Sequence, residues 1–314
     1  MSSTSSSSLM ADQTAMHSAI KQAGRCWKIP CANTWRSLSD IVIDWSIIYL
    51  SAWGAYKVGI WMAMLAIFVI GNRQRALGNM LHEAGHQNLS VRRNINDWIA
   101  QVLLAPALLN NLRLYRLQHA RHHAWLGDPA HDPDYLPRVT RDGDRWLTVY
   151  ARVLCKPSIW SASMFGHLTG KRLTQRERFA MVLWWISSEA TLGVLAGEHF
   201  ALLFFALWIV ARGTVFHLIT TFREMTDHYG LRPGGIFRYT REIPDHGLIS
   251  ALFHPHHNGY HLTHHLYPHI PYCHLPSAHA YLKQLPLFNR DAIVCDTYLR
   301  GAQASVVGWG ARHA

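Results

Sequence analysis

Acidic residues and paired cysteines are both scarce in this chain of 314 residues. Asp and Glu number 19 against 30 Lys and Arg, which gives a formal net charge of +11. The five cysteines are odd in number and form no C-x-x-C pair. This pattern argues against a disulfide framework and predicts free thiols in a reducing compartment. The cysteines are Cys26, Cys31, Cys155, Cys273 and Cys295.

The opening of the sequence does not show the pattern of a cleavable leader, and no internal repeat is visible. This opening, MSSTSSSSLMADQ, has no basic start followed by an apolar run, so we expect no secretory signal but a solvated, partly disordered tail. No self-similarity occurs at a solenoid or propeller period, which argues against a repeat architecture.

Charged residues are nearly absent from two long stretches, residues 41–71 and 181–220. A single membrane crossing takes about 20 residues, so each stretch predicts a hairpin of two spans. Breaks around Lys57 and Gly197 place the four predicted transmembrane helices. Asp44 and Glu189 lie inside the predicted spans and bear on where their boundaries fall. Buried helices of a soluble protein are the alternative. The predicted spans are residues 39–56, 58–75, 179–196 and 199–220.

The basic residues predict the orientation of these spans. Sixteen Lys and Arg lie in residues 71–178, whereas Lys57 is the one basic residue in either short connection. By the positive-inside rule, both termini and the middle loop are cytoplasmic. This bias accounts for most of the positive net charge, so a nucleic-acid partner is not needed to explain it. Anionic lipid or an acidic protein could be a partner. We expect a cytoplasmic tail over 1–36, a membrane domain over 37–290 and a C-terminal tail over 291–314.

Histidine is abundant, with 22 residues, and eight of them form three clusters. LHEAGHQN (81–88) contains H-E-x-x-H, QHARHHAW contains H-x-x-H-H, and GYHLTHHLYPHIP repeats that pattern. Residues three or four apart share a helix face, so each cluster can aim its imidazoles at one point. Eight histidines exceed what one four-coordinate zinc can use but suit two metal ions. The clusters are His82 and His86; His119, His122 and His123; and His261, His264 and His265.

A ninth ligand is expected at the end of the last predicted span, in VFHLITTFREMTDHYG. On a helix, His217, Glu224 and His228 lie within about 20° of one another. His228 is favoured because it lies nearest the cytoplasm, and His217 remains the reserve candidate. If the second span continues as a helix, His82 lies on the cytoplasmic side of the membrane. The other two clusters are predicted on the same side.

The three clusters resemble the three histidine boxes of the membrane fatty acid desaturase superfamily. The resemblance includes their flanking sequences and extends over about residues 40–276. The clusters with their flanks read NMLHEAGHQNL, GDPAHDPDYLP and HNGYHLTHHLYPHIP. The resemblance implies an all-α integral membrane fold: about four transmembrane helices in two hairpins, and a cytoplasmic helical cap holding a histidine-rich di-metal site. The iron ligands that it implies are His82, His86, His119, His122, His123, His228, His261, His264 and His265.

The same resemblance implies an enzyme that uses O2, two iron ions and electrons from a separate ferredoxin or cytochrome b5-type donor. Its expected substrate is the acyl chain of a membrane lipid or a similar aliphatic compound. The run RQRALGNMLHEAGH also resembles a bacterial subgroup of dihydrorhizobitoxine desaturases, which would imply an amino-acid-derived substrate.

Four polar residues are expected to support the ligands without binding iron: Glu83, Glu224, Asp227 and Asn258. Metal-bound histidines usually need a partner on the second ring nitrogen. Asn258 could instead close a turn at Gly259. The three aspartates of GDPAHDPDYLP could accept hydrogen bonds from ligand imidazoles or cap a turn, and the sequence leaves both roles open.

Three other functions remain as alternatives. A hydroxylase or other oxygenase could use the same scaffold. An intramembrane zinc protease would use His82, Glu83 and His86 alone, leaving six histidines of the clusters without a role. A non-enzymatic metal transporter would place ligands along a path through the membrane, whereas these clusters are predicted beyond it.

Overall fold

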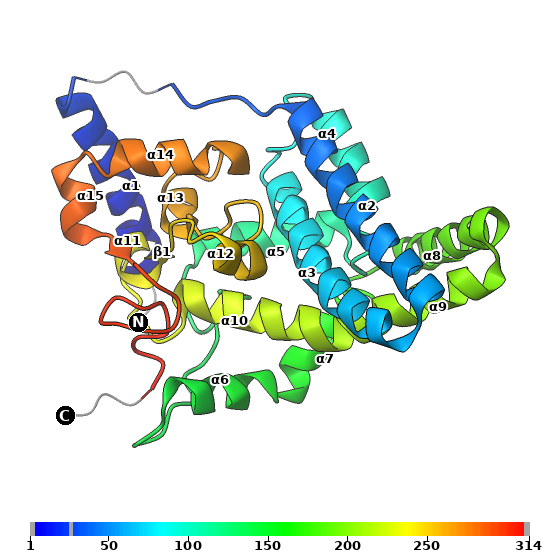
Figure 1. Cartoon of the computed structure of the whole chain (residues 1–314). Coiled ribbons are helices and arrows are strands. Elements are labelled where there is room, and N and C mark those ends of the chain that lie inside the picture. Colours follow the sequence, from blue (N-terminus) through cyan, green and yellow to red (C-terminus); the bar gives the residue numbers. More distant parts are fainter. Residues whose placement is uncertain (1–3, 25–27, 311–314) are drawn as a thin grey trace. The chain divides into compact units, whose positions relative to one another are not determined.

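The computed structural model describes residues 4–24 and 28–310, and its regular secondary structure is almost entirely helical (Figure 1). The expected all-α class is therefore confirmed. Cys26 lies outside the described residues, and the four other cysteines are free thiols, as predicted. The chain forms two compact units. We call residues 33–115 and 154–221 the apolar unit, and residues 1–32, 116–153 and 222–314 the histidine unit.

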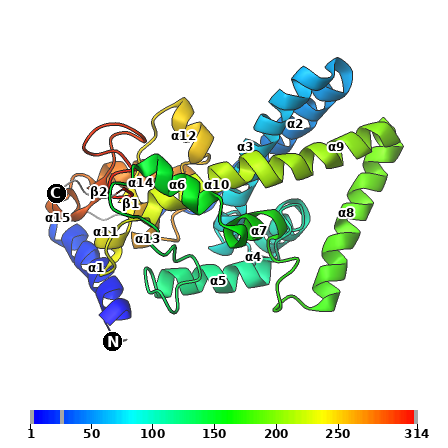
Figure 2. The same cartoon turned by 90° about the horizontal axis from the view of Figure 1, so that it is seen from below.

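Two helical hairpins form most of the apolar unit. Helices α2 (Thr34–Val58) and α3 (Ile60–Gly85) lie side by side and are joined at Gly59, whose φ of 97° suits glycine (Figures 1 and 2). Helices α8 (Gln175–Ala196) and α9 (Glu198–Ala211) meet in the same way at Gly197, with φ of 94°. Both hairpin breaks thus lie where the apolar pattern predicts them.

In the part of the chain that the structure describes, two helices are long and apolar enough to cross a membrane. They are α8 and a continuous helix, Glu198–His228, in which α9 passes through the π-turn η2 (Arg212–Phe216) into α10 (His217–His228). Helices α2 and α3, which form the first predicted hairpin, are less apolar and do not meet this criterion within the described residues. They carry charged side chains, among them Asp44 and Arg73, which form an ion pair of 2.8 Å.

Close packing holds α3 against the second hairpin. A Cβ atom on Gly71 would lie 2.6 Å from Val215 Cβ and 2.9 Å from the Phe216 nitrogen, so glycine permits this approach. One turn further along α3, the Gln74 side chain donates to the Trp208 carbonyl at 2.9 Å. The remaining helices of this unit are α4 (Arg93–Ile99), the π-turn η1 (Ala100–Leu104), α7 (Pro157–Phe165) and the start of α5 (Leu112–Ala124).

Short helices and one pair of two-residue strands make up the histidine unit. The strands β1 (Arg241–Glu242) and β2 (Ile293–Val294) pair in parallel. Its helices, besides the end of α5, are α1 (Thr4–Gln22), α6 (Trp146–Leu154), α11 (Ile236–Tyr239), α12 (Leu248–Phe253), α13 (His261–Leu266), the 3₁₀ turn η3 (Tyr272–His274), α14 (Leu275–Leu282) and α15 (Pro286–Asp291).

Both ends of the chain differ from the expected tails. Residues 4–22 form helix α1, because Leu9, Met16 and Ile20 join an apolar core that also contains Phe237 and Leu262. Near the other end, β2 pairs with β1 and Trp309 is fully buried. Apolar residues in both segments therefore contribute to the core of the histidine unit.

Candidate metal centre

Three helices of the histidine unit carry seven of the predicted ligands. Helix α5 ends in the sequence HARHHA, α10 ends at His228, and α13 consists of HLTHHL. The i, i+3 and i, i+4 spacings within α5 and α13 place their histidines on neighbouring turns, as the sequence predicts. The structure divides the seven into two groups: His122, His228, His261 and His265 form group A, and His119, His123 and His264 belong to group B.

Group A draws one imidazole from α5, one from α10 and two from α13. Its four ligand nitrogens all lie within 4.8 Å of one another. His261 Nε2 is 2.9 Å from His228 Nε2 and 3.1 Å from His265 Nε2. Adjacent nitrogens that share a metal at about 2.1 Å lie about 3 to 3.4 Å apart, so this spacing fits a metal site.

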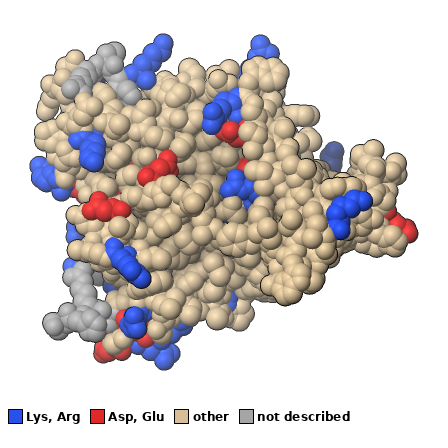
Figure 3. Space-filling view, in the orientation of Figure 1, with Lys and Arg blue, Asp and Glu red and all other residues tan. Residues whose placement is uncertain are grey.

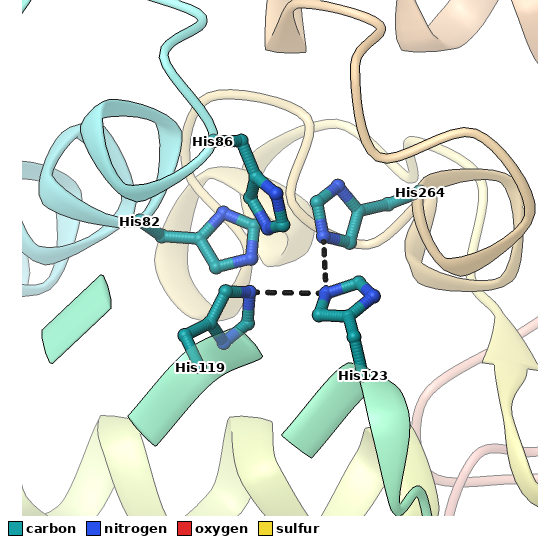
Figure 4. Close-up of side chains that lie close together, drawn as sticks. All are labelled: His82, His86, His119, His123 and His264. Carbon is teal, nitrogen blue, oxygen red and sulfur yellow. Dashed lines mark hydrogen bonds between the residues drawn. The ribbon is translucent and has the colours of Figure 1, made fainter. Parts of the chain in front are cut away.

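Group B repeats this arrangement with two imidazoles from α5 and one from α13. His123 Nε2 lies 3.1 Å from His119 Nε2 and 3.2 Å from His264 Nε2, along the dashed lines of Figure 4. Helices α5 and α13 therefore each supply histidines to both groups.

The first predicted cluster lies at the end of α3 in the apolar unit, and Figure 4 labels its two histidines as well. The rings of His82 and His86 have centroids 5.0 Å apart. His82 Nδ1 lies 3.2 Å from a Glu83 carboxylate oxygen, and Asn88 donates to the other oxygen at 3.2 Å. Glu83 is thus placed to orient His82, as metal-bound histidines require.

Two members of group A have their outer ring nitrogen held by the protein. His122 Nδ1 lies 2.8 Å from Asp132 Oδ1, and His228 Nδ1 lies 2.7 Å from the Tyr239 carbonyl oxygen. An imidazole that donates from Nδ1 keeps Nε2 unprotonated, with its lone pair directed toward the group. These contacts select the tautomer that a metal ligand needs.

Burial favours the neutral form of the central imidazoles. It lowers the pKa of His261 and His265 well below the ordinary value, and the neighbouring imidazoles lower both further. For His122 burial acts in the same direction, but the Asp132 carboxylate outweighs it and raises the pKa. Burial likewise tends to raise the pKa of Asp132, yet its bond to His122 prevails and lowers that pKa. Neutral imidazoles beside a carboxylate are a donor set for a divalent transition metal.

Asp227, predicted to support the ligands, lies fully buried beside group A. Its carboxylate is 2.8 Å from the Arg223 guanidinium and 3.4 Å from His254 Nε2. The other ring nitrogen of His254 lies 2.8 Å from the Tyr298 hydroxyl. A polar network therefore runs from the end of α10 into the C-terminal segment.

His217 lies outside both groups. Its Nδ1 is 2.9 Å from Ser163 Oγ and its Nε2 is 2.9 Å from the Leu154 carbonyl oxygen. Glu224 is half-buried and also belongs to neither group. Asn258 is buried, and its Oδ1 has no hydrogen-bond partner among the residues that the structure describes.

Two more carboxylates contact the histidine-bearing segments, one whose role the sequence left open and one that it did not indicate. Asp132 contacts His122 and also closes its own turn, accepting from Gly127 N at 2.8 Å and Asp134 N at 2.9 Å. The sequence left these two roles open for Asp132, and the structure combines them. Glu242 accepts a hydrogen bond from Thr263 in α13. Because it is 21 residues away in a short strand, no local spacing indicated this contact.

Comparison with known proteins agrees with this geometry. The family model described as fatty acid desaturase matches residues 26–295. The dihydrorhizobitoxine desaturase of Bradyrhizobium elkanii is 27% identical over 278 residues, covering 80% of this chain and 76% of that protein.

Two further relatives are named for acyl-lipid substrates. The chloroplastic sn-2 acyl-lipid omega-3 desaturase (ferredoxin) of Arabidopsis thaliana is 25% identical over 81% of this chain and 62% of its own length. The sn-1 oleoyl-lipid 12-desaturase of Synechocystis sp. is 25% identical over 50% of this chain and 44% of its own length. This chain therefore spans less than two thirds of either relative.

Proposed function

Because the chain belongs to the fatty acid desaturase family and is an oxidoreductase, we propose that it is a membrane-bound di-iron enzyme that desaturates an aliphatic chain. The observation that carries the proposal is the pairing of two histidine groups on shared helices. Imidazole alone is compatible with iron, copper or zinc, and the family favours iron.

We assign one iron to group A and the other to group B. In this proposal His82 and His86 are ligands as well, as the resemblance to the three histidine boxes implies, so that nine histidines bind two ions. His228 is the ninth ligand in preference to His217, whose two ring nitrogens already contact Ser163 and Leu154. Asn258 would hold a metal-bound water through its buried Oδ1.

The proposed arrangement in the membrane has four spans, formed by α2, α3, α8 and α9. Large apolar side chains are exposed on all four helices, including Leu50, Trp61, Val194 and Leu202. Figure 3 shows few charged atoms over α2 and α3. Apolar exposure on this scale is unfavourable in water and is expected of a surface that contacts lipid.

A topology measurement tests this arrangement. Single cysteines introduced at Gly59 and Gly197, in a cysteine-free background, should react with an impermeant reagent from the side opposite to a cysteine at residue 142. Labelling of residue 142 from the cytoplasmic side would place the middle loop in the cytoplasm, as proposed. Labelling of all three positions from one side would contradict the four-span arrangement.

The irons, reduced by an external ferredoxin or cytochrome, would activate O2 for removal of hydrogen from an unactivated C–H bond. The chain's own residues bind and orient the metals and exclude water. Asp132, Glu83 and the Tyr239 carbonyl hold ligand tautomers, while burial of His261, His264 and His265 keeps bulk water away.

Two substrate classes follow from the relatives. An acyl chain entering from the bilayer is favoured by the proposed spans and by the relatives named for acyl lipids. A second candidate is an amino-acid-derived molecule, because a relative that this chain matches over 76% of its length is named a dihydrorhizobitoxine desaturase. A hydroxylase on the same scaffold would differ in the product alone.

The first experiment measures metal content and products together. The detergent-purified protein, made with iron and zinc available, should hold about two irons per chain. Lipid and small-metabolite profiles of a host with and without the intact gene should differ by a new double bond. About one zinc per chain, retained when His122 is replaced by alanine, would instead support a protease.

A further inference from the structure

We propose that Glu242 is a positioning residue that holds the third histidine box, and through it both metal groups, in the ligating geometry. The inference rests on the proposed function, because it concerns how the iron ligands are kept in place. Glu242 lies in β1 and is fully buried.

The Glu242 carboxylate binds the middle of α13 at two points. Its Oε2 accepts from the Thr263 backbone N–H at 2.9 Å, and its Oε1 accepts from the Thr263 hydroxyl. His279 Nδ1 of α14 also lies 2.8 Å from Oε1. Three donors on one carboxylate fix α13 in both position and rotation, since hydrogen bonds to a charged acceptor are the stronger kind.

Thr263 lies between the ligands that this contact would control. His261 and His265 belong to group A, and His264 belongs to group B. A shift of α13 would therefore move ligand nitrogens in both groups at once. Metal sites are sensitive to such shifts, because removing an orienting partner costs roughly 10- to 100-fold in affinity.

Glu242 is itself held from both sides of the strand. The Cys295 N–H donates to its carbonyl at 2.8 Å, next to the pairing of β1 with β2. The following residue, Ile243, donates its N–H to the Gly259 carbonyl at 2.7 Å. A Cβ on Gly259 would lie 2.4 Å from the Ile243 oxygen, so glycine is required two residues before the box.

The cost of burying a carboxylate also argues for a specific role. A buried charge is unfavourable unless hydrogen bonds compensate it, and an apolar residue could fill the same space without that cost. What Glu242 supplies beyond packing is directional contact with the box and with His279.

The test compares Glu242→Gln with Asp144→Asn as the matched control. Asp144 is a carboxylate of the same unit that bonds Arg152 at 2.6 Å and lies outside both histidine groups. Each variant, iron-loaded, is mixed with a ferrous chelator, and the rate of iron release is recorded with its Mössbauer spectrum. Melting temperatures are measured with and without iron.

For Glu242→Gln we expect both irons to leave about 10- to 100-fold faster than in the wild type, with a changed spectrum. The rise in melting temperature on iron loading should shrink, while Asp144→Asn behaves as the wild type in release and spectrum. Thr263→Ala, which retains the backbone bond, should give an intermediate release rate.

Equal release rates for Glu242→Gln and wild type would overturn the proposal, as would a melting temperature lowered equally with and without iron. If Glu242→Gln does not fold, an unchanged release rate in Thr263→Ala is the overturning result. A wild-type protein that binds no iron would refute the proposed function instead, before any variant is compared.

Discussion

The two units of this protein differ in the side chains that they expose and in the charged side chains that they bury. In the apolar unit, Trp61 and Leu195 are more than three-quarters exposed, whereas small and apolar residues such as Gly71 and Ile48 lie inside. In the histidine unit, Asp227 and Glu242 are fully buried among histidines and arginine. The same chain thus shows an apolar exterior in one unit and a buried polar network in the other.

The difference is the one expected if, as proposed, the apolar unit lies in the membrane. Apolar groups are stable on a surface that faces hydrocarbon, so in that arrangement the apolar unit needs close helix packing rather than a large apolar core. Buried polar groups are stable when their hydrogen bonds are satisfied, so the histidine unit needs a connected polar network. Substitutions in the two units should therefore impair the protein for different reasons: loss of polar contacts in the histidine unit, and loss of helix packing in the apolar unit.

The largest effect is expected in the polar interior, at group A. His265→Ala removes one imidazole from the centre of the group and leaves the others without a full coordination shell. Iron per chain should fall to about one or less, and desaturation should be lost. His269→Ala is the control, because His269 is exposed on the same segment. Full iron content in His265→Ala would refute group A as a metal site.

The ion pair between Asp44 and Arg73 gives the next effect, in the apolar unit. Asp44→Leu leaves the guanidinium without its partner at 2.8 Å and should destabilise the protein by about 3 kcal/mol. Asp44→Leu combined with Arg73→Leu should be less destabilised than the single variant, because no unpaired charge remains. Thermal denaturation in detergent measures both, and additive losses would contradict this account.

A smaller effect is expected from Asp132→Asn. The amide keeps the shape of the side chain but weakens the hold on His122 Nδ1 at 2.8 Å. Iron affinity should fall by roughly 10- to 100-fold while the protein stays folded. Competition with a ferrous chelator gives the affinity. Asp128→Asn is the matched control, because Asp128 caps its turn through Ala130 N and His131 N.

The smallest effects on stability are expected at two glycines of the apolar unit, which differ in how closely they are packed. Gly71→Ala places a methyl group against Val215 and the Phe216 backbone nitrogen and should cost about 2 kcal/mol, within the usual range for overpacking. Gly193→Ala meets nothing within 4 Å and should stabilise α8 by about 0.5 to 1 kcal/mol. Both are read from thermal denaturation in detergent. Equal effects at the two positions would show that close packing at Gly71 is unimportant.

Local patterns predict much of this protein. The apolar runs and their glycine breaks anticipate hairpins joined at Gly59 and Gly197. The helical spacing of the histidines anticipates which faces of α5 and α13 carry ligands. The tails are predicted less well, because a serine-rich opening gives little sign that Leu9 and Met16 are buried.

The sequence by itself determined the helical class, the hairpin breaks and the identity of the histidine clusters, because these depend on spacing along the chain. The tertiary structure decided how the clusters mix, since groups A and B each combine histidines from α5 and α13. It also decided that Asp132 and Glu242 support those clusters. Such partners are selected by proximity in space, and a contact between Glu242 and Thr263 across 21 residues leaves no periodic signal.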